Sequence, residues 1–95
     1  MPALSAYANT ENTALILLQK KGFQFWYDEK TDRYHCERDG WDFTAESATE
    51  LLGVIAIFEH HQPKEYKEYW WRIREPWLME ELPNAPQDYV PVWHR

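Results

Sequence analysis

The feature that most constrains the fold is a two-residue alternation of side chains between positions 23 and 45. It divides into three segments, residues 23–28, 33–38 and 41–45. Such a period is typical of β-strands, because successive side chains point to opposite faces of a sheet. Asp39-Gly40 separates the last two segments and favours a type I′ hairpin turn, in which both residues adopt positive φ. We therefore expect a meander of three antiparallel strands.

The two turns also determine how the predicted strands pair. If Asp39 and Gly40 form a two-residue loop, Cys36 lies opposite Phe43, and a four-residue first loop places Trp26 beside His35. The inner face then carries the apolar set Phe23, Phe25, Tyr27, Tyr34, Cys36, Trp41 and Phe43. The outer face carries Gln24, Trp26, Asp28, Arg33, His35, Glu37, Asp42 and Thr44.

Helical patterns flank the three strand segments. Apolar residues recur at helical spacing over residues 11–21, and Gly22 then supplies a left-handed stop. Downstream, Ser47 and Glu50 form a capping box before an apolar stretch that ends at Pro63. The expected order is α-β-β-β-α, and a meander with helices packed on one face is an α+β fold.

The C-terminal third combines aromatic residues with prolines. Its aromatic and aliphatic residues follow a helical period at Tyr66, Tyr69, Trp70 and Ile73. This spacing predicts a third, aromatic helix that ends before Pro76, whereas a strand is disfavoured because Lys67 interrupts the alternation. Residues 83–95 contain three prolines and are expected to form an irregular tail.

The length fits a single domain over residues 1–95. We expect residues 1–9 to be frayed, residues 11–61 to form the α-β-β-β-α core, and residues 62–95 to pack on that core as the aromatic helix and tail. Six tryptophans among 95 residues bring enough apolar area to stabilise so short a chain.

Charge and cysteine content restrict the partners and the compartment. A formal net charge of −6 argues against nucleic-acid binding, which depends on lysines and arginines. With one cysteine the chain cannot form an intramolecular disulfide, and no secretory signal or membrane-spanning apolar run is visible. We expect a cytoplasmic protein without a cofactor or membrane contact, either a monomer or a weak homodimer.

The expected order over residues 11–61 is similar to that of double-stranded-RNA-binding domains. In that family the second helix opens with a lysine-rich motif that binds phosphate. Residues 47–50 of this chain read Ser-Ala-Thr-Glu, with a carboxylate and no lysine. The resemblance is therefore one of topology, and no RNA-binding residue can be transferred to this sequence.

Aromatic residues and arginines supply the candidate partner-binding residues. Such residues dominate the hot spots of protein interfaces, and here they are Trp26, Trp70, Trp71, Arg72, Arg74 and Trp77. The same tryptophans also fit a folded core. The sequence predicts a non-catalytic protein-interaction module that uses its aromatic C-terminal segment to contact another protein. The alternative is an acidic inhibitor or immunity-type protein that binds a basic enzyme.

A metal-binding or enzymatic site on the outer face is the third hypothesis. An imidazole and two carboxylates, from His35, Glu37 and Asp42, share that face and are suitable metal ligands or proton-transfer groups. Cys36 falls on the inner face, where a lone cysteine acts as a small apolar residue. We name no catalytic residue.

Overall fold

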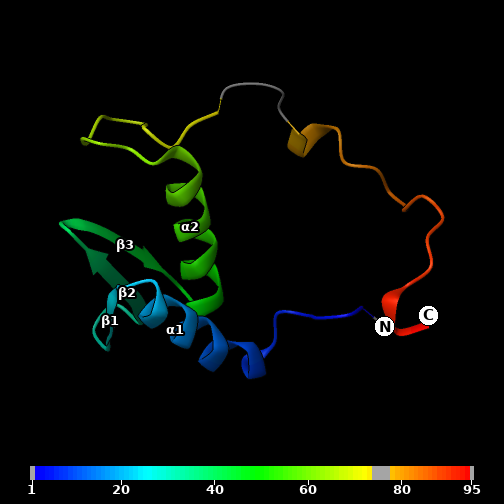
Figure 1. The fold of residues 1–95 in the computed structure, drawn as a ribbon, viewed down its shortest axis with the longest axis horizontal. Coiled ribbons are helices and arrows are strands. Elements are labelled where there is room, and N and C mark those ends of the chain that lie inside the picture. The colour runs from blue at the N-terminus through cyan, green and yellow to red at the C-terminus, as the bar shows by residue number, and fades with distance from the viewer. Residues whose placement is uncertain (1, 74–77, 95) are drawn as a thin grey trace.

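The computed structural model describes residues 2–73 and 78–94. It shows an α+β fold in which two helices pack on one face of a three-stranded antiparallel sheet (Figure 1). The elements are α1 (Glu11–Lys20), β1 (Gln24–Asp28), β2 (Arg33–Arg38), β3 (Trp41–Ala45) and α2 (Ala48–His61). The strand order β1-β2-β3 confirms the predicted meander. Within the described residues, no helix is both long and apolar enough to cross a membrane.

The strands pair in the predicted register. Cys36 pairs with Phe25 on β1 and Phe43 on β3, while His35 pairs with Trp26 and Thr44. Asp39 and Gly40 have φ angles of 53° and 86°, the left-handed values that a type I′ turn requires. The Cys36 row therefore faces the helices, and the His35 row faces outward.

The core lies between the inner face of the sheet and the two helices. Leu18 of α1, Cys36 of β2, and Leu51 and Ile55 of α2 are fully buried. Burial of each leucine or isoleucine side chain contributes about 1.5–3 kcal/mol to the stability of the fold. The helices cover β1 less completely. Its inner-face residue Tyr27 therefore remains 45% exposed.

The predicted cap residue Ser47 begins α2, but the second bond of the capping box goes to Glu46 and not to Ser47. The Ser47 hydroxyl accepts a hydrogen bond from the Glu50 backbone N–H at 3.1 Å, and the Glu50 carboxylate accepts from the N–H of Glu46 at 3.3 Å. At the other end, Gln62 adopts a left-handed φ of 46° and closes the helix before Pro63. Local sequence signals therefore define both ends of α2.

The predicted third helix is wrong for the described residues 62–73, which form turns. Trp70 N–H donates to the Lys67 carbonyl and Arg72 N–H donates to the Tyr69 carbonyl, both three-residue turn bonds. Tyr69 has a φ of 59°, which no α-helix accommodates. The segment between two prolines is too short for a stable isolated helix, and aromatic residues are weak helix formers.

The prediction of an irregular tail over residues 83–95 is not confirmed, because Val92–His94 within it forms a 3-10 turn. Residues 78–94 contain two 3-10 turns, Leu78–Glu80 and Val92–His94, joined by backbone without regular structure. All side chains of this segment are exposed except the half-buried Pro91. Figure 1 shows the segment, in orange and red, running away from the sheet and helices.

Candidate protein-interaction surface

Trp70 connects the C-terminal segment to the core. Its ring meets those of Trp41 and Phe58 edge-to-face, with centroids 5.4 and 6.1 Å apart, and it also contacts the His61 ring at 5.9 Å. Trp70 is therefore partly buried and packs against the core cluster. This arrangement gives Trp70 a structural role, and it holds the backbone of the following residues close to α2.

The next residues line a shallow hollow beside α2. The hollow has a volume of about 390 Å³ and is lined by Ala56, Ile57, His60, His61, Trp71 and Ile73. Trp71 is 47% exposed, Ile57 is 47% exposed and Ile73 is 66% exposed, so large apolar groups face solvent around it. We call this hollow, with Tyr69 and Arg72 beside it, the C-terminal face.

Arg72 orders the aromatic side chains of the C-terminal face. Its guanidinium carbon lies 4.2 Å from the centroid of the Tyr69 ring and 5.6 Å from that of Trp71. These cation–π contacts favour one arrangement of the two rings and keep a positive charge beside the hollow. The polar side chains that line the hollow are the imidazoles of His60 and His61, and no carboxylate belongs to its lining.

The structure divides the predicted partner-binding residues between two faces. Trp71 and Arg72 lie together on the C-terminal face, and Trp70 packs against the core cluster. Trp26 lies on the outer face of the sheet, on the side opposite the helices. The predicted residues Arg74 and Trp77 lie outside the described residues.

Trp26 stacks on His35 across the β1–β2 pair. The two rings are nearly parallel, at 5°, with centroids 5.4 Å apart, and Trp26 is 45% exposed. Nε2 of His35 is enclosed and has no hydrogen-bond partner among the described residues. The imidazole therefore supports the indole and does not offer this nitrogen to a ligand from solvent.

Glu37 and Asp42 lie directly opposite each other on the same face of the sheet as Trp26, as the register predicts. Glu37 accepts hydrogen bonds from Gln24 Nε2 at 2.6 Å and from Gly40 N–H at 2.8 Å, and these bonds lower the pKa of its carboxyl. Glu37 thus stabilises the turn between β2 and β3. Among the described residues, no group of three histidine, cysteine, aspartate or glutamate side chains is placed to hold a metal ion. The predicted set His35, Glu37 and Asp42 therefore does not form a metal site in this structure.

Two further titratable groups have structural explanations. Cys36 is completely buried, and burial raises the pKa of its thiol to about 11, which makes it a poor nucleophile. The hydrogen bond from the Tyr27 hydroxyl to Asp32 raises the pKa of Tyr27 to about 12. Neither group lines the C-terminal face.

Sequence reasoning missed the contribution of α2 to the C-terminal face. Ile57 and His60 lie in the helix that the sequence predicts between the capping box and Pro63, and both are exposed. Helical spacing alone gives no signal that separates the exposed Ile57 from the buried apolar residues Ile55 and Phe58 of the same helix. Comparisons with protein-family models, with curated proteins and with solved structures find no match to this chain.

Proposed function

We propose that this chain is a non-catalytic protein-interaction module. Its C-terminal face binds a partner segment that combines apolar and acidic side chains. The observation that carries the proposal is the contrast between neighbours: Trp70 packs on the core, while Trp71 and Ile73 remain exposed around a hollow. Contiguous exposed apolar groups of this size are typical of interaction surfaces.

The side chains of this face are those that give binding energy in protein interfaces. Tryptophan, tyrosine and arginine are enriched among hot-spot residues, and the Arg72 contacts hold Tyr69 and Trp71 in place before a partner arrives. A preordered face loses less side-chain entropy on binding, which favours affinity. Ile57, on the rigid helix α2, provides a fixed apolar wall.

The charges near the face favour an acidic partner. The lining of the hollow contains no carboxylate, and the guanidinium of Arg72 lies beside it. Residues 62–73 carry Lys64, Lys67 and Arg72 against Glu65 and Glu68, although the whole chain has a net charge of −6. This local excess of cations complements carboxylates on a partner.

The titratable groups support a non-catalytic role. Strongly shifted pKa values often mark catalytic sites. Among residues 2–73 and 78–94, the groups with a shifted pKa are Glu11, Tyr27, Cys36 and Glu37, and each shift is explained by a structural hydrogen bond or by burial. None of them belongs to the lining of the hollow on the C-terminal face.

A peptide-display selection against the immobilised full chain tests the proposal. We expect enrichment of peptides that combine leucine, valine or aromatic residues with aspartate or glutamate. Their affinity should fall at least tenfold in Trp71→Ala, because hot-spot truncations typically cost more than about 1.4 kcal/mol. Trp26→Ala is the matched control, since it removes an equally exposed indole from the opposite face.

The same selection tests a second candidate function, binding of a basic partner by the outer face. The exposed Trp26 lies on that face with the opposed carboxylates of Glu37 and Asp42, which suit lysine or arginine side chains. Enrichment of basic peptides that lose affinity in Trp26→Ala, in Asp42→Asn and at high salt would favour this candidate. Selection of no peptides that depend on either tryptophan would contradict both.

A further inference from the structure

We propose that the partner of the C-terminal face is a second copy of this chain, whose segment 78–93 docks there. Two copies would exchange these segments reciprocally and form a homodimer. The inference rests on the proposed function, because it names the occupant of the same face. It is carried by a match between the C-terminal face and the exposed residues 78–94, which are called the tail from here on.

The tail carries many exposed apolar side chains, and none of them belongs to the core cluster or to the residues packed against it. Seven large apolar residues in it are between 46% and 73% exposed: Leu78, Met79, Leu82, Tyr89, Val90, Val92 and Trp93. Leaving so many together in water is unfavourable, since monomeric proteins rarely expose large apolar areas. A surface that covers these side chains would remove the penalty.

The charge of the tail complements that of the C-terminal face. Residues 78–94 carry Glu80, Glu81 and Asp88 and contain no lysine or arginine. The tail is thus an acidic and apolar segment, which is the chemistry inferred for the partner from the hollow and from Arg72. Opposite charges on the two surfaces speed encounter and disfavour unrelated partners.

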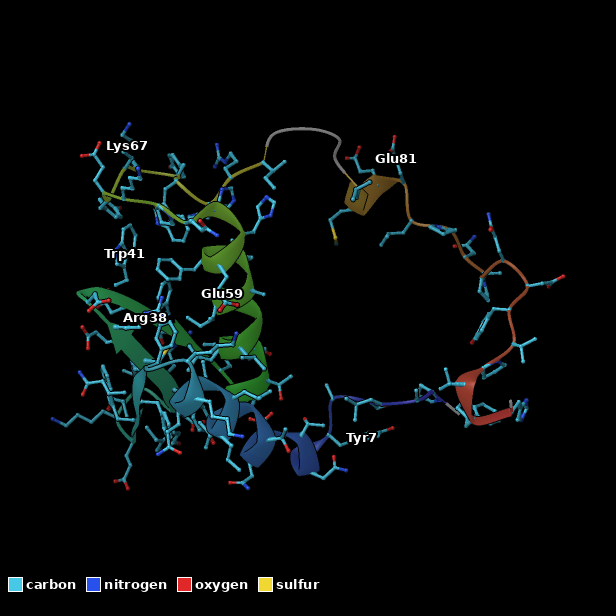
Figure 2. The ribbon with its side chains drawn as sticks, viewed as in Figure 1. Tyr7, Arg38, Trp41, Glu59, Lys67 and Glu81 are labelled. Carbon is cyan, nitrogen blue, oxygen red and sulfur yellow. The ribbon has the colours of Figure 1, made fainter. Side chains whose placement is uncertain are left out.

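The structure favours exchange between copies over folding back within one chain. In this chain the hollow is uncovered and the tail is exposed. Figure 2 shows Lys67 near the C-terminal end of α2. Glu81, on the tail, lies away from this end of the helix. A reciprocal contact uses both tails and both hollows, so a symmetric dimer leaves none of these surfaces unmatched.

Sedimentation equilibrium of the full chain over about 1–500 µM tests the exchange. We expect a monomer–dimer equilibrium that weakens with added salt. An acceptor variant, Trp71→Ala, and a donor variant, Leu82→Ser/Tyr89→Ser, should each weaken dimerisation on the order of 30-fold, in line with loss of hot-spot side chains. Trp26→Ala should leave it unchanged. Ile73→Ser serves as a second acceptor variant if Trp71→Ala alters the circular dichroism spectrum.

Mixing the two impaired variants distinguishes exchange from other dimers. The intact tail of Trp71→Ala can dock on the intact face of the donor variant, so the mixture should recover one contact and form a heterodimer. A dimer in which two Trp71 side chains meet would gain nothing from mixing, and that result would overturn the inference.

A monomer at every concentration would also overturn it. If display selection still yields acidic and apolar peptides that need Trp71, the proposed function survives and the self-association fails. If selection yields none and the chain stays monomeric, both fail.

Discussion

Glu11 shows how a single side chain can join two helices at their beginnings. It is the first residue of α1, and its carboxylate accepts hydrogen bonds from the Ala48 N–H and the Thr49 hydroxyl, each at 2.6 Å. These groups lie in the first turn of α2, where backbone N–H groups lack partners within the helix. The bond from Thr49, followed by that from the Ala48 backbone, holds the pKa of Glu11 below its usual value.

This contact predicts a change in the pH dependence of stability. A carboxylate with a lowered pKa in the folded state stabilises the protein above its unfolded pKa, near 4.5, and that contribution disappears as the pH falls through the folded value. Glu11→Gln should therefore lower the free energy of unfolding by about 1 kcal/mol at pH 7, as loss of a helix cap does. The difference from the wild type should shrink toward pH 3 in urea titrations.

Glu29→Gln, in an exposed turn, is the matched control and should change stability little at either pH. Parallel stability curves for Glu11→Gln and the wild type from pH 7 to pH 3 would show that ionisation of Glu11 adds no stability to the folded state. Sequence alone could not reveal this contact. It joins residues 37 and 38 positions apart, and it depends on how α1 and α2 are placed, whereas the Ser47 cap involves neighbours three residues apart.

At the scale of elements, the strands were predictable and the C-terminal turn was not. The turn at Asp39-Gly40 allows few backbone conformations, which fixes how β2 and β3 pair. A register shift by one residue would also move Cys36 and Phe43 to the solvent-exposed face of the sheet. In the C-terminal segment the helical period of Tyr66, Tyr69, Trp70 and Ile73 was present. However, the packing of Trp70 against Trp41 and Phe58 is compatible with a turn, and side-chain spacing does not reveal the left-handed Tyr69.

The neighbours Trp70 and Trp71 provide a test of how this turn is held. Trp70→Ala removes contacts with Trp41, Phe58 and His61, and we expect a loss of about 1–3 kcal/mol in unfolding free energy, less than for a fully buried tryptophan. Trp71→Ala removes an exposed ring and should cost less than about 0.5 kcal/mol.

Urea denaturation followed by circular dichroism measures both variants under the same conditions. Equal losses for Trp70→Ala and Trp71→Ala would mean that the assignment of one ring to the core and the other to the surface is mistaken. A large loss for Trp71→Ala alone would move Trp71 into the structural cluster and remove it from the proposed partner surface.

At the scale of the whole molecule, the candidate surface was only partly visible in the sequence. Trp71 and Arg72 were named because of their residue types, and the structure places them on one face. Trp26 belongs to a different face, and Ile57 of α2 joins the surface from fourteen residues upstream of Trp71. Exposure of an apolar helical residue depends on which elements cover it, and the hydrophobic pattern of a single sequence does not contain that information.

The distribution of buried residues leads to a last prediction, about the tail. The buried core residues run from Ala14 to Phe58, and residues 78–94 contribute none. Removal of residues 78–95 should therefore change the unfolding free energy by less than about 0.5 kcal/mol at a few micromolar, where a weak dimer is dissociated. If the tails are exchanged, the full chain gains stability from association as its concentration rises, and the shortened chain does not.

Thermal unfolding at several protein concentrations measures both effects. The melting temperature of the full chain should rise with concentration, while that of the shortened chain stays constant. Trp71→Ala in the full chain should behave like the shortened chain, because it lacks the surface that receives the tail. A large loss of stability on shortening at low concentration would instead mean that residues 78–95 stabilise the core of their own chain. The tail would then belong to the folded body and not to the interface.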